Sequence, residues 1–331
     1  MADKLTLLIS SVGRRAQLVD CFRRAAHELG LQLRVIGADA APDLSPASQL
    51  VDRCFPVPRC SDPTFVDEML RLCELEAVRL VVPTIDPELP VFARSRQKFE
   101  TAGTKVVISG PRTVEIAADK VATNRWFVEH HFPTVRQTTL SDAVSDRNLE
   151  RWKFPVIVKP RQGSASVGVR IIQSPQALRD LQENGLLVEE IATGIEHTTN
   201  VFVDQSGKCL CAVPHKRLET RAGEVSKGVT TKNPMLMQLI KEVAESLPDA
   251  RGPLNIQGFV SKDGSIKLTE INARFGGGFP LAFEAGANFC RWIIEDLLAL
   301  PSTAAFSQWK DDLLMLRFDS AVFLPSRNPH A

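Results

Sequence analysis

The first third of the chain alternates short apolar runs with longer segments in which apolar residues recur at helical spacing. Runs rich in Leu, Ile and Val predict strands, and the intervening segments predict helices. Near-continuous apolar strands separated by helices are typical of a parallel sheet covered on both faces. We therefore predict an α/β domain with strands at 5–10, 33–39, 53–57, 79–83 and 105–109, and with helices at 14–29, after Asp62-Pro63 and at 87–102.

The ends of these predicted strands carry polar residues, and ligands of parallel sheets bind at strand ends. Only Gly13 stands where a dinucleotide-binding fingerprint needs three glycines, so a Rossmann-type dinucleotide site is disfavoured. Arg14 and Arg15 follow it and can bind a carboxylate or a phosphate. Asp86 and Glu88 end another strand and can hold an ammonium group. Helix capping explains both sets equally well.

From residue 111 onward the pattern changes to helices and short strands joined by turns, which predicts an α+β region with mainly antiparallel pairing. A polar stretch at 215–232 predicts a long loop. The remaining predicted elements are helices at 111–130, 176–184 and 235–247, and strands at 154–160, 169–172, 186–191, 198–204, 208–214, 254–261, 265–272 and 313–324.

A predicted hairpin places four oxygen-bearing side chains on one face of a sheet. Asp263-Gly264 is a strong signal for a two-residue turn, and with that turn Gln257 lies opposite Glu270. Asn255 then lies opposite Asn272, and the two-residue period puts all four on the same face. Hard oxygen donors grouped in this way suit Mg²⁺. The alternatives are a solvent-facing polar sheet surface, or a three-residue loop that shifts the register and breaks this pairing.

Two further segments have weaker signals for phosphate and nucleotide binding. Lys159 ends an apolar strand and precedes Gly163–Gly168, whose small residues let backbone N–H groups close around phosphate oxygens. This is no Walker A loop, and a flexible turn is the ordinary explanation of such a segment. In 187–196, acids end a strand and reappear after Gly194, a pattern that solvated acids beside a turn also produce.

Taken in this order and spacing, these segments resemble the ATP-grasp superfamily over residues 112–300, most closely the type found in the carbamoyl phosphate synthetase large subunit, biotin carboxylase and D-alanine–D-alanine ligase. The most specific match is the segment Thr269-Glu-Ile-Asn-Ala-Arg-Phe-Gly-Gly277. The preceding α/β domain looks like the Rossmann-like pre-ATP-grasp domain. The resemblance implies a pre-ATP-grasp domain at 1–111, an ATP-grasp lid subdomain at 112–190 and a C-terminal subdomain with the metal site at 191–325.

The resemblance also implies how the nucleotide and metal are held. Lys120 and Lys159 would contact the ATP phosphates beneath a mobile loop that includes Gly163, Ser164, Ser166 and Gly168. Glu189, Glu190 and the backbone of Ala192 would border the adenine, and Glu196 would bind the ribose. Glu270 and Asn272 would bind Mg²⁺, with Mn²⁺ as the alternative metal. Gln257 stands where many relatives have an acid, which weakens a second metal.

For the reaction itself, the resemblance assigns Arg274 to the transferred phosphoryl group or the acyl phosphate. Arg217 and Lys227, from the basic stretch after Pro214, would face the phosphates and the substrate carboxylate. A solvated charged loop is the alternative for that stretch, because Glu219 and Glu224 balance its bases. Substrate contacts at Arg14, Arg15, Asp86 and Glu88 complete the expected site.

Three functions remain open at this point. The first is an ATP- and Mg²⁺-dependent ligase that joins a small carboxylate to an amine, such as amino acids, through an acylphosphate, releasing ADP and phosphate. The second is carbamoyl-phosphate-type phosphorylation of bicarbonate, although 331 residues hold only one ATP-grasp core. The third is a non-catalytic ATP-binding regulatory protein. The absence of the lysines or of the metal ligands would favour this function, but the sequence has both sets of residues.

Composition narrows the list of partners and the location. Lys and Arg total 40 against 39 for Asp and Glu, without a basic arm, which disfavours nucleic-acid and polybasic membrane binding. No apolar run approaches the ~20 residues of a membrane span, and the start is too short for a signal peptide. The seven cysteines never form C-x-x-C, and Cys209 and Cys211 alone make a poor zinc site. We therefore expect a cytoplasmic enzyme acting on small molecules; a homodimer is compatible with the resemblance.

Overall fold

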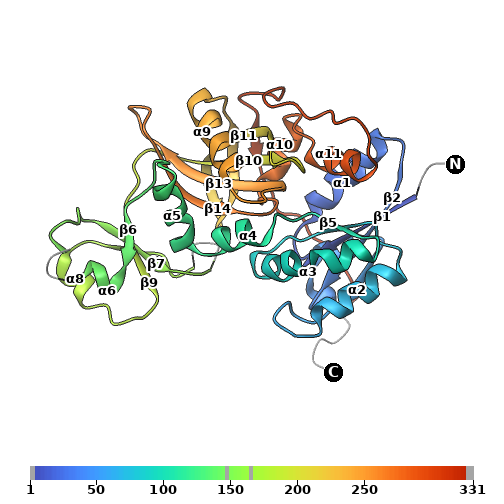
Figure 1. Cartoon of the computed structure of the whole chain (residues 1–331), viewed down its shortest axis with the longest axis horizontal. Helices are drawn as coiled ribbons and strands as arrows, with labels where there is room; N and C mark the ends of the chain where they lie inside the picture. The colour runs from blue at the N-terminus through green and yellow to red at the C-terminus, as the bar shows by residue number, and fades with distance from the viewer. Residues whose placement is uncertain (1–3, 146–148, 164–166, 326–331) are drawn as a thin grey trace.

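The computed structural model describes residues 4–145, 149–163 and 167–325, which form three sheets of five, six and four strands. The five-stranded and four-stranded sheets lie at opposite ends of an elongated molecule, with the six-stranded sheet between them (Figure 1). The fold is therefore an α/β domain followed by an α+β region, as the sequence pattern predicts. No helix in the described ranges is long and apolar enough to cross a membrane.

The five-stranded sheet is parallel, with the order β3-β2-β1-β4-β5. Helices cover both faces, as predicted. One face packs on α2 and α3 through side chains such as Phe65 and Phe92, and the other packs on α1 through Phe22. The strands are β1 (Lys4–Ser10), β2 (Gln32–Asp39), β3 (Arg53–Pro56), β4 (Leu80–Val82) and β5 (Lys105–Val106); the helices are α1 (Ala16–Glu28), α2 (Phe65–Leu75) and α3 (Leu89–Thr101), with 3-10 turns at Pro42–Leu44, Pro46–Gln49 and Asp86–Glu88.

Two short helices lead from this domain to the small four-stranded sheet. The sequence predicts one helix at 111–130, but the structure breaks it at Asp119, whose carboxylate accepts a hydrogen bond from the Val121 N–H and caps a second helix. Lys120 is thereby the first residue of that helix. These helices are α4 (Pro111–Ala118) and α5 (Lys120–Glu129); the sheet has the order β6-β9-β7-β8, with β6 (Gln137–Thr139), β7 (Val156–Pro160), β8 (Arg170–Ile172), β9 (Leu186–Glu190), α6 (Leu140–Ala143) and α8 (Pro175–Arg179).

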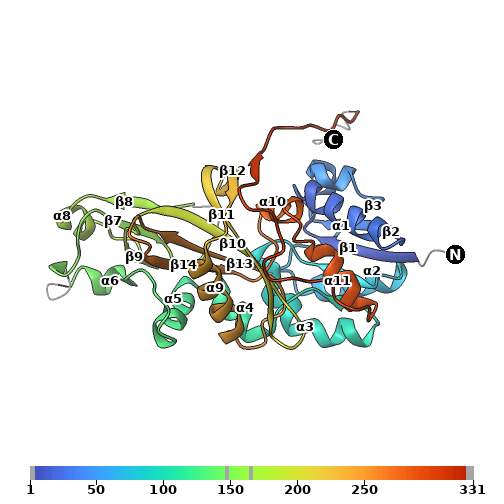
Figure 2. The same cartoon turned by 90° about the horizontal axis from the view of Figure 1, so that it is seen from above.

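The six-stranded sheet is antiparallel, has the order β14-β13-β10-β11-β12-β15, and separates the two other sheets when seen from above (Figure 2). Its apolar residues share a core with α9 on one side and with α1, α10 and α11 toward the first domain. Its strands are β10 (Ile195–Val203), β11 (Cys209–Arg221), β12 (Glu224–Thr230), β13 (Gly252–Val260), β14 (Ile266–Asn272) and β15 (Leu314–Leu316); its helices are α9 (Pro234–Ser246), α10 (Phe279–Glu284) and α11 (Phe289–Leu297).

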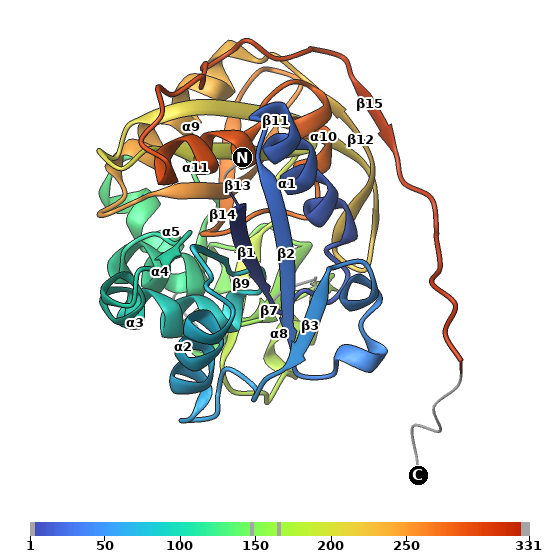
Figure 3. The same cartoon turned by 90° about the vertical axis from the view of Figure 1, so that its right-hand side faces the viewer.

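Three predicted elements differ most clearly from the structure, and the predicted strand at 105–109 is also shorter, since β5 covers only Lys105–Val106. Residues 215–232, predicted as a loop, form most of the β11–β12 hairpin, whose far end is exposed and therefore lacks an apolar pattern. The predicted helix at 176–184 shrinks to α8. The predicted strand at 313–324 is only β15, which pairs with β12 at the sheet edge and continues into an extended segment (Figure 3).

The β13–β14 hairpin keeps the predicted pairing at its functional end but not at its turn. The Ser261 N–H donates to the Ser265 carbonyl, so three residues, Lys262 to Gly264, close the turn. A register shift between Gln257 and Gly258 then compensates for the extra residue. Gln257 therefore lies opposite Glu270, and Asn255 opposite Asn272, as predicted.

Candidate active site

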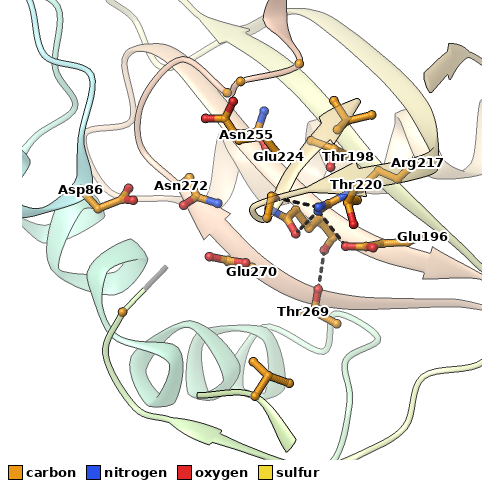
Figure 4. A pocket seen from close by; sticks show the side chains of 18 of the residues that line it. Asp86, Glu196, Thr198, Arg217, Thr220, Glu224, Asn255, Thr269, Glu270 and Asn272 are labelled. Carbon is orange, nitrogen blue, oxygen red and sulfur yellow. Dashed lines mark hydrogen bonds and ion pairs between the residues drawn. The ribbon is translucent and has the colours of Figure 1, made fainter. Parts of the chain in front are cut away.

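A cavity of about 550 Å³ lies where the three sheets meet. The first domain contributes the loops after β1 and β4, the small sheet contributes β7 and β9, and the large sheet contributes β10 to β14. Figure 4 shows side chains from the first domain and from the large sheet in the same pocket. The predicted residues that line it are Arg14, Arg15, Asp86, Lys120, Lys159, Gly163, Glu189, Glu190, Ala192, Glu196, Arg217, Gln257, Glu270, Asn272 and Arg274.

The polar face of β13 and β14 forms one wall of this cavity. Asn255, Gln257, Glu270 and Asn272 all line it, which rules out the alternative of an ordinary solvent-facing surface. Arg217 on β11 donates from Nη1 to the Gln257 amide oxygen at 3.1 Å. The oxygen of Gln257, which we expected to bind a metal, therefore already accepts a hydrogen bond from the positively charged Arg217.

The oxygen atoms of Glu270 and Asn272 remain the best donors for a divalent cation. No group of three His, Cys, Asp or Glu side chains suited to a metal occurs in the described part of the chain. A cation here would therefore take one carboxylate and neutral oxygens and complete its shell with phosphate and water, which is the usual coordination of Mg²⁺. The donor set fits magnesium bound together with a nucleotide.

Two lysines approach the same cavity from the small sheet and its linker. Lys159, at the end of β7, pairs with Glu189 on β9 at 2.7 Å, and both side chains are almost buried. Lys120 donates to the Gly163 carbonyl at 2.7 Å. Burial lowers the pKa of Lys120, as does the nearby Lys159, while Glu270 raises it. Lys120 thus lies within electrostatic reach of both Lys159 and Glu270 of the oxygen-donor wall.

The acids expected at the adenine and ribose have well-defined partners. Glu190 pairs with Lys267 and accepts the Arg136 N–H at 3.0 Å; burial opposes its ionisation, but these hydrogen bonds hold its pKa below the usual value. Glu196 accepts from Arg217 Nη1 at 2.8 Å, and burial raises its pKa. Both carboxylates lie at the cavity wall. Glu190 on β9 has two partners, Lys267 on β14 and the Arg136 N–H, whereas Glu196 on β10 has Arg217 on the adjacent strand β11.

The glycine-rich loop is only partly described. Gly163 lines the cavity, whereas Ser164 and Ser166 lie outside the described residues. Gly168 has φ +75°, and a Cβ there would lie 2.9 Å from the Pro160 side chain, so this position needs glycine for backbone and packing reasons.

Ion pairs join the first domain to the large sheet at the far end of the cavity. Arg274 donates from Nη2 to Asp86 at 2.6 Å and to Asn272 at 3.2 Å. Arg15 donates from Nη1 to Glu224 on β12 at 3.1 Å and from Nη2 to the Thr84 carbonyl at 3.2 Å. Arg14 is exposed at the cavity wall.

Two expected contacts are placed elsewhere by the structure. Glu88 is fully buried and accepts four hydrogen bonds, from Ser10, Ser11 and the Thr84 and Ile85 N–H groups, so it ties the ends of β1 and β4 together instead of lining the cavity. Lys227 also lies outside the cavity, because its position on β12 pairs it with Glu219 at 2.7 Å on the exposed side of the hairpin.

Sequence reasoning missed Glu224, which it treated as a charge-balancing loop residue. Glu224 lines the cavity and is held by Arg15 on one side and by Arg317, after β15, at 3.2 Å on the other. Only the fold brings Glu224 to the cavity, next to Gly277, where a Cβ would lie 2.5 Å from the Glu224 carboxyl carbon.

Two arginine donors on cavity-lining side chains have no acceptor within the described part of the chain. The Nε atoms of Arg217 and Arg274 are buried and lack a hydrogen-bond partner among the described residues. Buried polar groups are nearly always hydrogen-bonded, and leaving one unpaired costs about 1–3 kcal/mol. Both atoms belong to side chains that line the cavity.

An α/β domain followed by two sheets that enclose a cavity, with lysines on one wall and oxygen donors on the other, defines a nucleotide-binding protein of the ATP-grasp type. Residues 7–107 match the model of the PylC-like N-terminal domain, and residues 117–278 match that of the ATP-grasp domain. The chain thus contains an ATP-grasp domain, preceded by a PylC-like N-terminal domain.

Individual relatives agree on this fold. A D-alanine–D-alanine ligase of Streptococcus uberis is 24% identical over 235 residues, 61% of this chain and 65% of that protein; the chain thus spans about 65% of the length of this curated relative. The biotin carboxylase domain of Hydrogenobacter thermophilus 2-oxoglutarate carboxylase, solved with MgADP, ADP and bicarbonate, superposes with TM-score 0.72, 15% identity and coverage of 93% of this chain and 73% of that one. An L-amino acid ligase from Bacillus licheniformis gives TM-score 0.64, 20% identity and coverage of 93% and 77%.

Proposed function

We propose that this protein is an ATP-dependent ligase that joins the carboxylate of one small molecule to the amine of another, with ADP and phosphate as products. The observation that carries the proposal is the pair of buried, unpartnered Nε donors of Arg217 and Arg274 in a cavity that also holds Lys120 and Lys159. Four cationic side chains with unused donors suit a triphosphate and the acyl phosphate formed from it.

In the first step a carboxylate oxygen attacks the γ-phosphorus, and the bond to the β-γ bridging oxygen breaks as ADP leaves. This step brings two anions together, so neutralising charge and fixing geometry supply most of the catalysis. Lys159 is paired with Glu189 at 2.7 Å and would shift toward the incoming phosphates. Glu190, Ala192 and Glu196 are our proposed contacts for adenine and ribose.

Glu270 and Asn272 would hold one Mg²⁺, or Mn²⁺, which when bound neutralises phosphate charge. We propose a single metal site, because Glu270 contributes the one carboxylate among the four side chains of this face, and arginines already donate to both the Gln257 oxygen at 3.1 Å and the Asn272 oxygen at 3.2 Å. Arg217 then supplies at this position a positive charge that a second metal would otherwise provide.

The end of the cavity next to the first domain is our proposed substrate site. Arg14 and Arg15 offer guanidinium donors for a carboxylate, and Asp86 can exchange its Arg274 partner for an ammonium group. Charges of both signs within one cavity fit zwitterionic substrates, and we propose amino acids. The L-amino acid ligase among the structural neighbours is consistent with this class.

We also propose that the chain is divided into three parts, at 1–111, 112–190 and 191–325, and that the protein forms a homodimer. A cytoplasmic location fits a reaction that uses ATP and a protein whose seven cysteines are all free thiols.

A phosphate-release screen of paired amino acids with ATP and Mg²⁺ tests the function. We expect release only when an acid and an amine are both present, and we expect Lys159→Ala and Glu270→Gln to abolish it. Lys227→Ala is the matched control, because Lys227 lies outside the cavity and should leave turnover within about twofold of wild type, as for exposed ion pairs.

Other products would contradict the mechanism in distinct ways. AMP and pyrophosphate would exclude the acylphosphate route, and incorporation of labelled bicarbonate would indicate carboxyphosphate chemistry instead. ATP binding without turnover under any pairing would indicate a non-catalytic protein. Unchanged turnover in Glu270→Gln would show that the assigned site is wrong.

A further inference from the structure

One buried histidine in the cavity has a hydrogen-bonding group that the phosphate and metal contacts leave unused. His215 on β11 is 1% exposed and lines the cavity. Its Nε2 atom is buried and has no hydrogen-bond partner in the described part of the chain. Because an unpaired polar group in a protein interior is costly, its position at a cavity wall indicates a contact with a ligand.

A hydrogen-bond network across three neighbouring strands decides which ring nitrogen carries the proton. Asn255 on β13 donates to the Asn200 side-chain oxygen on β10 at 3.2 Å, which fixes the orientation of the Asn200 amide. The Asn200 amino group then faces His215 Nδ1 at 3.4 Å. Nδ1 is the acceptor, so this network assigns the proton to Nε2. The free group at the cavity is therefore an N–H donor.

This donor carries no charge. Burial, together with the nearby Arg217 and His197, lowers the pKa of His215 to about 3. The imidazole is therefore neutral at any ordinary pH and keeps its single proton. It can donate a hydrogen bond without adding a positive charge to a wall that already holds Arg217.

Two glycines keep this network in contact with the cavity. A Cβ at Gly278 would lie 2.8 Å from His215 Nε2, and a Cβ at Gly276 would lie 2.2 Å from Asn255 Nδ2. Because neither position carries a Cβ, the segment that leaves β14 leaves space beside His215 Nε2 and the Asn255 amide. Any side chain at either glycine would push away the group beneath it.

We propose that His215 Nε2–H donates a hydrogen bond to the acyl oxygen of the substrate while the amine attacks the acylphosphate, a proposal that rests on the proposed function. In this step the amine nitrogen forms the C–N bond, and the carbonyl π pair moves onto the oxygen. That pair then returns to re-form the carbonyl, and the bond between the acyl carbon and the phosphate oxygen breaks. Phosphate departs with this bonding pair and takes up the proton that the amine loses. A fixed neutral donor stabilises the transient oxyanion more than the carbonyl oxygen it came from.

The test separates acylphosphate formation from amide formation. With acid but no amine, isotope scrambling between the β-γ bridge and the non-bridging β-oxygens of ATP reports the first step. We expect His215→Leu to keep ATP affinity and scrambling within about fivefold of wild type and to lower the kcat of ligation by roughly 10²–10³-fold, as for removal of one oxyanion donor. His215→Gln places an amide N–H near the position of Nε2 and should recover most of that loss.

His197 provides the matched control. It is also a buried histidine, on the adjacent strand β10, but its Nδ1 bonds the Ile195 carbonyl at 2.8 Å and it does not line the cavity. His197→Gln should therefore leave ligation near the wild-type rate. The kcat–pH profiles of wild type and His215→Gln should run parallel between pH 6 and 9, since the imidazole does not titrate there.

Each contrary result has one meaning. If wild type shows no turnover that depends on both acid and amine, the proposed function itself is wrong. If wild type turns over and His215→Leu ligates equally fast, only the role of His215 is wrong. Equal losses of ATP affinity, scrambling and ligation in His215→Leu, without recovery in His215→Gln, would also refute an acyl-oxygen contact and indicate a structural role.

Discussion

Glu88 allows a quantitative test of whether the acids at the strand ends bind substrate or hold the sheet together. Its carboxylate accepts the Thr84 and Ile85 N–H groups at 2.6 and 3.2 Å and the Ser10 and Ser11 hydroxyls at 2.7 and 2.8 Å. In Glu88→Ala the hydroxyls can rotate toward other acceptors, but the two backbone N–H groups cannot. Leaving each buried N–H unpaired costs about 1–3 kcal/mol, so we expect a loss of about 3 kcal/mol in unfolding free energy.

The corresponding change in melting temperature follows from chain length. Unfolding entropy of about 2.1 cal/mol/K per residue gives roughly 0.7 kcal/mol/K for 331 residues if they unfold together, so about 3 kcal/mol lowers Tm by about 4 °C. Glu88→Gln keeps an oxygen for both backbone N–H groups, and its amino group can donate to the serine hydroxyl oxygens. We therefore expect less than half of that decrease for Glu88→Gln by differential scanning calorimetry.

Kinetics on the same variants separate the two roles. If Glu88 is structural, Glu88→Gln should keep the KM of each substrate within about threefold of wild type, because the loop that carries Asp86 stays in place. A wild-type Tm together with a hundredfold higher KM for the amine-bearing substrate would refute this reasoning and place Glu88 against the substrate.

Three further outcomes test other parts of the site. Gly277→Ala should displace Glu224, because the Glu224 carboxyl carbon would lie 2.5 Å from the new Cβ. We expect this variant to raise the KM of the substrate and to leave the ATP affinity, measured by calorimetry, unchanged. An unchanged KM would contradict the role of Glu224. Gln257→Glu adds a carboxylate opposite Glu270 and should lower the Mg²⁺ concentration for half-maximal activity by roughly threefold to tenfold, since affinity rises with ligand charge; no change would place the metal elsewhere. Five thiols are buried, and burial raises the pKa of all seven. At pH 8 a disulfide reagent should therefore label at most two cysteines in the native protein, and labelling of more would show that the buried thiols are accessible. The buried set is Cys21, Cys73, Cys209, Cys211 and Cys290, and the half-buried pair is Cys54 and Cys60.

The polar face of β13 and β14 was predicted correctly although one of the two signals behind it, the length of the turn, was wrong. The Asp263-Gly264 turn and the alternation of polar and apolar residues both place Gln257 opposite Glu270. The turn is nevertheless one residue longer than predicted, and the register shift after Gln257 restores the pairing. A pattern of two-residue period does not encode such a shift, so the functional pairing was correct while the turn was not.

Periodicity did not predict the β11–β12 hairpin, because many of its side chains line the cavity or face solvent and do not pack in a core. Within it, Arg217 pairs with Gly228 and Glu219 pairs with Lys227. This register directs Arg217 to the cavity and Lys227 to the exposed side, where Glu219 neutralises it. Two basic residues of one predicted loop looked equivalent in sequence, and only strand pairing distinguishes them.

The two ends of the cavity depend on different parts of the chain, and this division has a consequence for substrate choice. The lysines and the oxygen-donor wall lie within residues 117–278, the segment that matches the ATP-grasp model. At the far end, the ion pairs Arg274–Asp86 and Arg15–Glu224 join that segment to the first domain. Arg317, which follows β15, also forms an ion pair with Glu224. Substitutions in the loops after β1 and β4, or at Arg317, can therefore alter the substrate contacts while the phosphate contacts stay in place. We expect Arg317→Met to raise substrate KM with unchanged ATP affinity, whereas a parallel loss of both would show that the two ends are not independent.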